Sequence, residues 1–145
     1  MDNNKKVIIL FFPSPWPGEA RGRIPHALLY LERMVRDFGL EIIIIDEQVE
    51  KNYITKIEAV KDRLLLACVS SMTGHQIIGG IRFSKLIKNI CGAPIVWGGW
   101  HPSCMADQTL RHPLVDIVVR GQGEETFKEL LGALSRGESL KGIKG

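Results

Sequence analysis

The stretch LLLACVSSMTGHQIIGGIRFSKLIKNICGAPIVWGG, residues 64–99, decides the fold class. It opens with the continuous apolar run Leu64–Val69 and closes with a second run, Ile95–Trp97. Between the two runs, the apolar residues of segment 77–90 recur at helical spacing, and a glycine and a proline then stop the helix. Strands that read as continuous apolar runs are buried on both faces, as in parallel sheets. The stretch therefore predicts a strand–helix–strand unit with a right-handed crossover.

The same alternation extends toward both ends of the chain. Three further apolar runs are Val7–Phe12, Ile42–Ile45 and Leu114–Val119. Helical patterns cover residues 24–38, 54–64 and 127–134. Buried strands with helices between them need helices on both faces of the sheet. The pattern predicts an α/β fold, a flavodoxin-like doubly wound five-stranded parallel sheet of order 2-1-3-4-5.

The composition is that of one globular domain. The chain has 145 residues, of which 45% are hydrophobic and 24% charged, and a domain usually has about 100–200 residues. The net charge is only +3 and no dense Lys/Arg block concentrates it, so we expect no nucleic-acid partner. The longest apolar runs fall short of the ~18 residues that span a bilayer, and the first residues form no secretory signal pattern. We therefore expect a cytoplasmic protein without membrane contact.

Three cysteines, Cys68, Cys91 and Cys104, give no disulfide framework and no C-x-x-C metal motif. Cys68 lies inside an apolar run and is expected to be a small buried hydrophobic residue. Cys91 ends a helical pattern and is expected to be structural. Cys104 lies in a glycine-rich region and is the cysteine that qualifies as a site candidate.

The loops that follow the predicted strands are the candidate site, because ligands of open parallel sheets bind at the carboxyl ends of the strands. Three of these loops contain glycine: residues 70–75, 98–103 and 121–126. Glycine lets the backbone approach a ligand closely, and hydroxyl groups at a helix start can bind an anion or an amide. Together the loops predict a broad floor for a large flat ligand. The dinucleotide, P-loop and hydrolase-elbow motifs are absent, which disfavours those three functions.

Three sequence elements carry a resemblance to a known family. They are SSMTGH at residues 70–75, GGWHP at residues 98–102 and VDIVVRGQGE at residues 115–124. In this order and spacing they resemble the N-terminal cobalamin-binding domain of cobalamin-dependent radical S-adenosylmethionine (SAM) enzymes. The resemblance covers nearly the whole chain. It implies that residues 1–136 are a cobalamin-binding domain and residues 137–145 are a linker toward a radical SAM domain, in cis or in trans.

The resemblance also implies the cofactor, cobalamin, and its contacts. In that family the corrinoid lies across the carboxyl ends of the strands, and its nucleotide tail enters beside the loops after the third, fourth and fifth strands. The implied cofactor-binding residues are Ser70, Ser71, Met72, Thr73, Gly74, Gly98, Gly99, Trp100, His101, Gly121, Gln122 and Gly123. If Gly99 meets the corrinoid by close backbone approach, Gly99→Leu is expected to abolish binding while the fold survives.

The sequence lacks two motifs of cobalamin and radical enzymes. The D-x-H-x-x-G motif, whose His binds cobalt in methionine synthase and the mutases, is absent, so no metal ligand is predicted and His101 is only a weak candidate. The C-x-x-x-C-x-x-C motif of the iron–sulfur cluster is absent as well. No catalytic residue is therefore expected in this chain, and SAM and a [4Fe-4S] cluster are expected only on another domain.

Two other functions stay open at this point. Residues 70–74 at a helix start also suit an anion, which would allow a flavodoxin-like FMN-binding or anion-binding protein. Flavodoxins, however, place their phosphate loop after the first strand, where this chain has the Pro-rich segment 13–17. The third possibility is a non-catalytic interaction domain, with Trp16 and Trp100 as exposed anchors of a partner surface.

Overall fold

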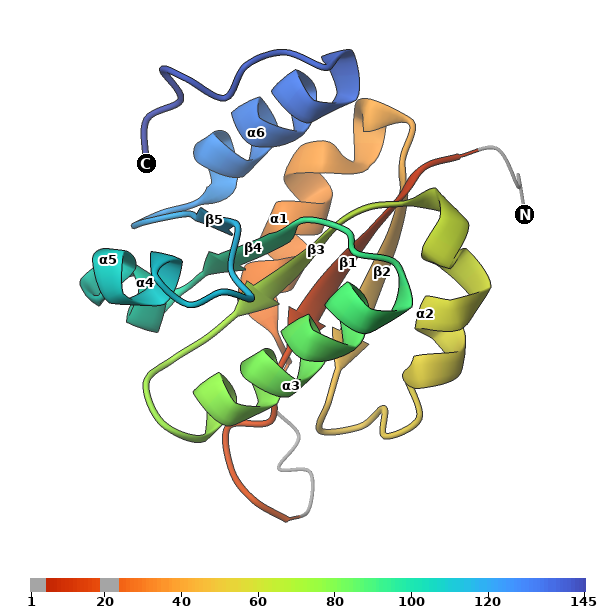
Figure 1. The fold of residues 1–145 in the computed structure, drawn as a ribbon, viewed down its shortest axis with the longest axis vertical. Helices are drawn as coiled ribbons and strands as arrows, with labels where there is room; N and C mark the ends of the chain where they lie inside the picture. Colours follow the sequence, from red (N-terminus) through yellow and green to blue (C-terminus); the bar gives the residue numbers. More distant parts are fainter. Residues whose placement is uncertain (1–4, 19–23) are drawn as a thin grey trace.

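A computed structural model describes residues 5–18 and 24–145, and its centre is an all-parallel five-stranded sheet (Figure 1). The strands are β1 (Val7–Phe12), β2 (Glu41–Asp46), β3 (Leu64–Ser70), β4 (Ile95–Gly98) and β5 (Ile117–Val118). Their order across the sheet is β2-β1-β3-β4-β5. This order confirms the predicted doubly wound fold, in which the strand order reverses between β1 and β3.

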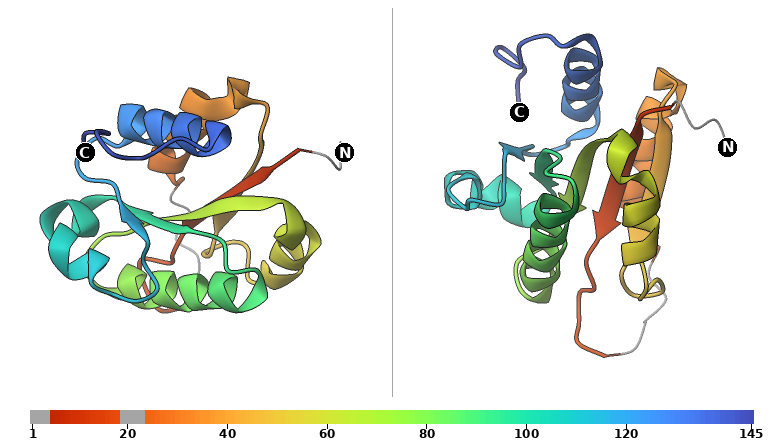
Figure 2. Two further views of the ribbon diagram at one scale, coloured as in Figure 1. Left: turned by 45° about the horizontal axis from the view of Figure 1, so that its top comes forward. Right: turned by 45° about the vertical axis from the view of Figure 1, so that its right-hand side comes forward.

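Helices cover both faces of the sheet, as predicted. They are α1 (His26–Val35), α2 (Ile54–Val60), α3 (His75–Ile90), α4 (Trp100–Cys104), α5 (Ala106–Leu110) and α6 (Glu124–Arg136). Short 3-10 turns, η1 (Arg36–Phe38) and η2 (Lys61–Arg63), extend α1 and α2. Helices α1 and α6 lie on one face and α2 and α3 on the other, while α4 and α5 lie beyond the β4–β5 edge (Figures 1 and 2).

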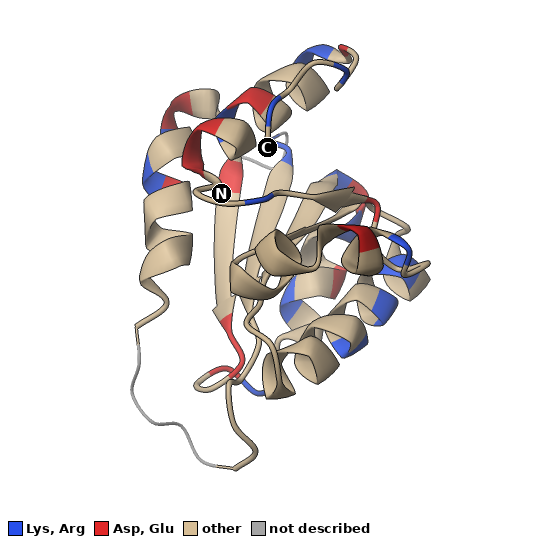
Figure 3. Ribbon diagram, turned by 90° about the vertical axis from the view of Figure 1, so that its left-hand side faces the viewer, with Lys and Arg blue, Asp and Glu red and all other residues tan. Residues whose placement is uncertain are grey.

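The apolar side chains of the strands form one core layer on each face. Toward α2 and α3, the rings of Phe11 and Phe83 stack with their centroids 4.1 Å apart. Toward α1 and α6, Leu28 and Leu131 pack over Ile8 and Leu66. The charged residues lie on helices, loops and strand ends, and the middle of the sheet carries none (Figure 3). Burial on both faces explains why the strands read as continuous apolar runs.

Three elements, β5, α4 and α5, differ from the sequence prediction. The fifth strand was expected over residues 114–119, but its register with β4 covers only Ile117 and Val118. The amides of Asp116 and Val119 still donate hydrogen bonds to the carbonyls of Ile95 and Trp97 in β4. Val115 lies outside this pairing and is 8% exposed, so this end of the apolar run reports burial in the core. Helices α4 and α5 were not predicted, because five-residue helices are too short to show a periodic pattern.

The C-terminal segment packs back on the domain. After Gly137, whose φ of +67° ends α6, the chain returns along this helix (Figure 2). The Thr126 hydroxyl donates a hydrogen bond to the carbonyl of Lys144, and the Arg120 amide donates one to the carbonyl of Gly145. The end of the chain thus lies beside the loop after β5. Within the described part of the chain, no helix has the length and hydropathy needed to cross a membrane.

Candidate functional site

A cavity of about 670 Å³ lies at the carboxyl ends of β3, β4 and β5, on the face covered by α1 and α6. Its apolar wall comes from strand positions and from the inner sides of both helices: Phe12, Leu28, Leu31, Cys68, Val96, Val119 and Phe127. Its rim comes from three loops, residues 70–72, 98–100 and 121–123. We call it the glycine-rimmed cavity. Concave apolar sites with a few polar groups are typical of sites for organic ligands.

The structure brings most of the predicted site residues together at this cavity. Nine of them line it: Ser70, Ser71, Met72, Gly98, Gly99, Trp100, Gly121, Gln122 and Gly123. Thr73, Gly74 and His101 do not line it. Thr73 and His101 instead meet each other, with the Thr73 Oγ1 atom 3.1 Å from Nδ1 of His101. Trp100 and His101, expected in a loop, lie in the first turn of α4.

The two adjacent glycines of the β4 loop have different roles. Gly99 has a φ of +96°, and a Cβ atom there would lie 2.8 Å from the carbonyl oxygen of Ser71 and 2.9 Å from its amide nitrogen. The protein's own backbone therefore requires this glycine. The expectation that a Gly99→Leu protein keeps its fold is not supported by this geometry. At Gly98 the nearest atom to a built Cβ is 3.7 Å away, so this position has room for a side chain.

The side chain of Ser103 joins two loops of the rim. Its hydroxyl donates a hydrogen bond of 2.7 Å to the carbonyl of Gly99 and accepts one of 2.8 Å from the amide of Gly121. The loop after β4 is thereby tied to the loop after β5. Ser103 ends the predicted site loop 98–103, but its connecting role was not predicted, because nothing in a single sequence shows that a serine in α4 faces a loop 18 residues later.

A buried glutamine joins two other loops. Gln76 is 2% exposed. Its Nε2 donates a hydrogen bond of 2.7 Å to the carbonyl of Pro13, and its Oε1 accepts one of 2.8 Å from the amide of Met72. The loops after β1 and β3 are thus held together at the point where strand order reverses, which is where such sheets bind ligands.

Some predicted contacts have different roles in the structure. The Ser71 side chain is buried, and its hydroxyl donates to the carbonyl of Met72 rather than pointing outward. Met72 and Trp100 are 42% and 75% exposed, and both lie on the rim. An exposed thioether and an exposed indole beside an apolar cavity leave a surface onto which a large flat ligand can extend.

The apolar wall was not predicted as part of the site. Leu28, Val96 and Phe127 were expected only as parts of predicted helices and strands and were not named as cofactor contacts. These side chains are 1%, 3% and 2% exposed, so they do belong to the core layer under α1 and α6. The signal that could have found them is position: each lies on the same face as a rim glycine and near the carboxyl end of the sheet.

The cysteines and metal-binding groups form no metal site in the described residues. Cys68 is buried in the cavity wall, Cys91 is half-buried, and Cys104 is exposed. Cys68 confirms the expectation of a buried residue, and Cys104 lines the cavity. Burial raises the pKa of the Cys68 thiol far above its usual value. Across residues 5–18 and 24–145, no three His, Cys, Asp or Glu side chains converge to hold a metal ion.

The cavity fits part of one large cofactor. Its apolar wall suits a flat aromatic base such as the benzimidazole of the cobalamin nucleotide tail, and the open space at Gly98 leaves room that a Cβ would begin to fill. The amide and carbonyl groups of the rim loops are available to the polar linker that precedes this base in the tail.

Comparisons with known proteins identify the family of the chain. Residues 24–131 match the B12 binding domain family. An uncharacterized methyltransferase of Pyrococcus horikoshii is 38% identical over 83% of this chain, which corresponds to 27% of that protein. The chain thus spans about a quarter of the length of this curated relative.

Solved structures show the same fold. The radical S-adenosylmethionine methyltransferase TsrM from Kitasatospora setae, with cobalamin and a [4Fe-4S] cluster bound, superimposes with a TM-score of 0.79 at 23% identity. The match covers 97% of this chain and 26% of TsrM. The cobalamin-dependent S-adenosylmethionine radical enzyme OxsB gives a TM-score of 0.76 at 18% identity, over 99% of this chain and 20% of OxsB. Since the family match covers most of its length, the chain belongs to the B12-binding domain family, and its cofactor is cobalamin.

Proposed function

We propose that this chain is the cobalamin-holding module of a radical SAM enzyme. The glycine-rimmed cavity takes the nucleotide tail, and the corrin ring lies over the carboxyl ends of the strands. The observation that carries the proposal is the convergence of the three loops that resemble the family on one apolar cavity beside the point where strand order reverses. The similarity to TsrM and OxsB supports the radical SAM context.

The residues present indicate which tasks belong to the chain and which belong to the cofactor. When bound, the cobalt supplies the methyl-transfer or related radical chemistry. The chain itself excludes water from the tail with the apolar wall and keeps the rim loops in place through Ser103 and Gln76. A cofactor site whose loops are already hydrogen-bonded to one another loses little conformational freedom on binding. SAM and the iron–sulfur cluster belong to a separate radical SAM domain in this proposal.

The domain limits are part of the same proposal. Residues 1–136 form the cofactor module, and residues 137–145 lead toward the radical SAM domain. The contacts of Lys144 and Gly145 with Thr126 and Arg120 support this path, because they bring the connecting segment to the loop that carries the Gly121–Gly123 rim. A catalytic domain attached there would reach the exposed side of the corrin ring.

The flavin alternative has less support. A flavodoxin phosphate site would use free amides in the loop after β1. Here the amide of Ser14 donates a 2.9 Å hydrogen bond to the buried carboxylate of Glu47, and the family match is to cobalamin binders. A partner surface around Trp100 is compatible with cofactor binding, since the indole lies on the outer rim.

Titration with hydroxocobalamin tests the proposal directly. We expect saturable binding, which is monitored through the visible spectrum and by calorimetry. Since no D-x-H-x-x-G motif offers a ligand, the spectrum should be that of a base-off corrinoid without a new nitrogen on cobalt. A folded chain that shows no saturable binding would contradict the proposal. A yellow protein that retains flavin would favour the alternative.

Alkylation of the cysteines maps the same site. Cys104 is exposed at the cavity, whereas Cys68 is buried with a raised thiol pKa. Since the thiolate is the reactive form, we expect iodoacetamide to modify Cys104 readily and Cys68 only after unfolding. Cobalamin should slow the modification of Cys104, measured by mass spectrometry. Cys91, which does not line the cavity, is the internal control, and equal slowing at Cys91 would contradict the placement of the cofactor.

A further inference from the structure

A second cavity, of about 490 Å³, lies at the same edge of the sheet but on the face covered by α2 and α3. Its walls follow the carboxyl ends of β1 and β2 and the first turns of α3. Six polar residues define what we call the polar cavity: Ser14, Glu47, Lys51, Tyr53, His75 and Arg82. None of them is among the cofactor-binding residues that the resemblance implies, although His75 ends the predicted site loop 70–75.

The polar cavity is organised around one buried carboxylate. Glu47 is 8% exposed, and its carboxylate accepts hydrogen bonds from the amide of Ser14 at 2.9 Å and from the guanidinium of Arg82 at 3.2 Å. Lys51 Nζ donates to the carbonyl of Glu47 at 2.7 Å. Burial and the Glu47 charge raise the pKa of Tyr53, so its hydroxyl stays protonated as a donor.

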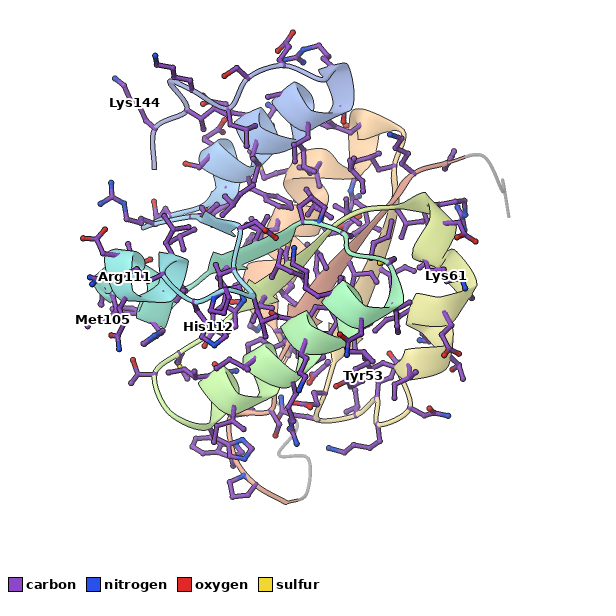
Figure 4. All side chains as sticks on the ribbon, viewed as in Figure 1. Tyr53, Lys61, Met105, Arg111, His112 and Lys144 are labelled. Carbon is purple, nitrogen blue, oxygen red and sulfur yellow. The ribbon has the colours of Figure 1, made fainter. Side chains whose placement is uncertain are left out.

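The donors around this carboxylate face open space. Lys51 is exposed, and the side chain of Arg82 is 61% exposed while one of its nitrogens binds Glu47. Tyr53 lies at the start of α2, where that helix passes α3 (Figure 4). With one buried acid and two cations, the cavity has more donors than acceptors and a net positive charge. Such a site suits neutral or anionic ligands that offer carbonyl oxygens.

The two cavities are neighbours across the point where strand order reverses. His75 lines the polar cavity and Gln76, the next residue, lines the glycine-rimmed cavity. His75 Nδ1 lies 3.1 Å from the carbonyl of Ser14, and Gln76 binds the carbonyl of Pro13. The first turn of α3 and the loop after β1 therefore form a ridge with an apolar cavity on one side and a polar cavity on the other.

Cobalamin has the matching two-part chemistry. Its nucleotide tail ends in an apolar aromatic base, and its corrin ring carries a border of amide groups. We propose that the polar cavity is a subsite for amide side chains of the corrin ring, with Lys51 and Arg82 donating to amide carbonyls. This inference rests on the proposed function and assigns a role to a cavity that tail binding leaves unused.

The experiment compares two ligands. Cobinamide has the corrin ring and its amides but lacks the nucleotide tail, so it can use the polar cavity and cannot fill the glycine-rimmed cavity. We expect Lys51→Ala/Arg82→Ala to weaken the binding of cobinamide and of cobalamin by a similar factor, about tenfold for the loss of two charge-assisted hydrogen bonds at a partly exposed site. Gly98→Leu, which fills the glycine-rimmed cavity, should weaken the binding of cobalamin and leave the binding of cobinamide unchanged.

A charge-matched control is available on the same face of the molecule. Lys61 lies at the opposite end of α2 from Tyr53 (Figure 4), Lys85 is exposed on α3, and neither lines the polar cavity or the glycine-rimmed cavity. Lys61→Ala/Lys85→Ala removes the same charge and should leave both affinities unchanged. Thermal unfolding confirms that each variant is folded.

Each outcome decides between the possibilities. If the chain binds cobalamin but not cobinamide, the polar subsite is refuted and the proposed function stands. The same conclusion follows if cobinamide binds the Lys51→Ala/Arg82→Ala variant as tightly as it binds the unmodified chain. If the control substitutions weaken the binding of cobinamide as much as Lys51→Ala/Arg82→Ala does, the overall charge rather than the cavity is responsible, and the subsite is again refuted. If neither ligand binds the unmodified chain, the proposed function fails and the subsite fails with it.

Discussion

Gly98→Leu is expected to reduce the affinity for cobalamin by at least about a hundredfold. Gly98 faces the same side of the sheet as Val96, and its missing side chain leaves the floor of the glycine-rimmed cavity open. A Cβ there would have only ordinary contacts, the nearest at 3.7 Å from the carbonyl oxygen of Val119. The rest of a leucine side chain would occupy space proposed for the nucleotide tail. Calorimetric titration of the folded variant measures the loss.

Gly98→Ala is the matched control for this prediction. Its single added carbon fits the space around residue 98, so the fold should be unchanged and the loss of affinity small. The leucine variant should also keep its cooperative thermal unfolding, because the substituted position opens into a cavity rather than into packed core. Undiminished cobalamin binding by a folded Gly98→Leu protein would place the tail elsewhere.

Gly99→Ala is expected to destabilise the protein even without cofactor. The φ of +96° is unfavourable for any residue with a Cβ, and the new carbon would lie 2.8 Å from the Ser71 carbonyl oxygen. Backbone strain of this kind costs on the order of 1–3 kcal/mol, and the close contact adds to it. Urea unfolding of the cofactor-free chain should therefore show a loss of about 2–4 kcal/mol.

The comparison of the two alanine variants separates fold from binding. Gly98→Ala and Gly99→Ala add the same atom to neighbouring residues, and only the second brings it within 3 Å of backbone atoms. Equal stability of the two variants in urea would contradict the structural role of Gly99. The pair also shows why Gly99 is a poor probe of cofactor contact, since any loss of binding there would follow from a shifted Ser71 loop.

The sheet was predictable because its strands are buried on both faces. Continuous apolar runs such as Val7–Phe12 have no other common explanation when helices alternate with them, and the strand order followed from that alternation. The limits of β5 were not predictable in the same way. Apolarity reports burial, and Val115 is buried without lying in the paired part of the strand.

The site was predictable at its rim and not in its interior. Glycine and hydroxyl residues at strand ends are visible in a sequence, and most of those chosen do line the cavity. The bonds that connect the loops depend on residues far apart in the chain: Gln76 meets Pro13 across 63 positions. The polar cavity was missed for the same reason, because its residues come from three separate segments and share no motif.

The Gln76 bridge has a consequence for the order of events in folding. Its two partners, the loops after β1 and β3, become neighbours only when these strands have paired. A local unit built from β3, α3 and β4 alone would form the Met72 contact but leave the other end of Gln76 without Pro13. Contacts between distant parts of the chain form late, because closing the loop between them costs entropy first. Competence to hold the cofactor should thus be acquired in the last stage of folding, after the N-terminal strand has entered the sheet.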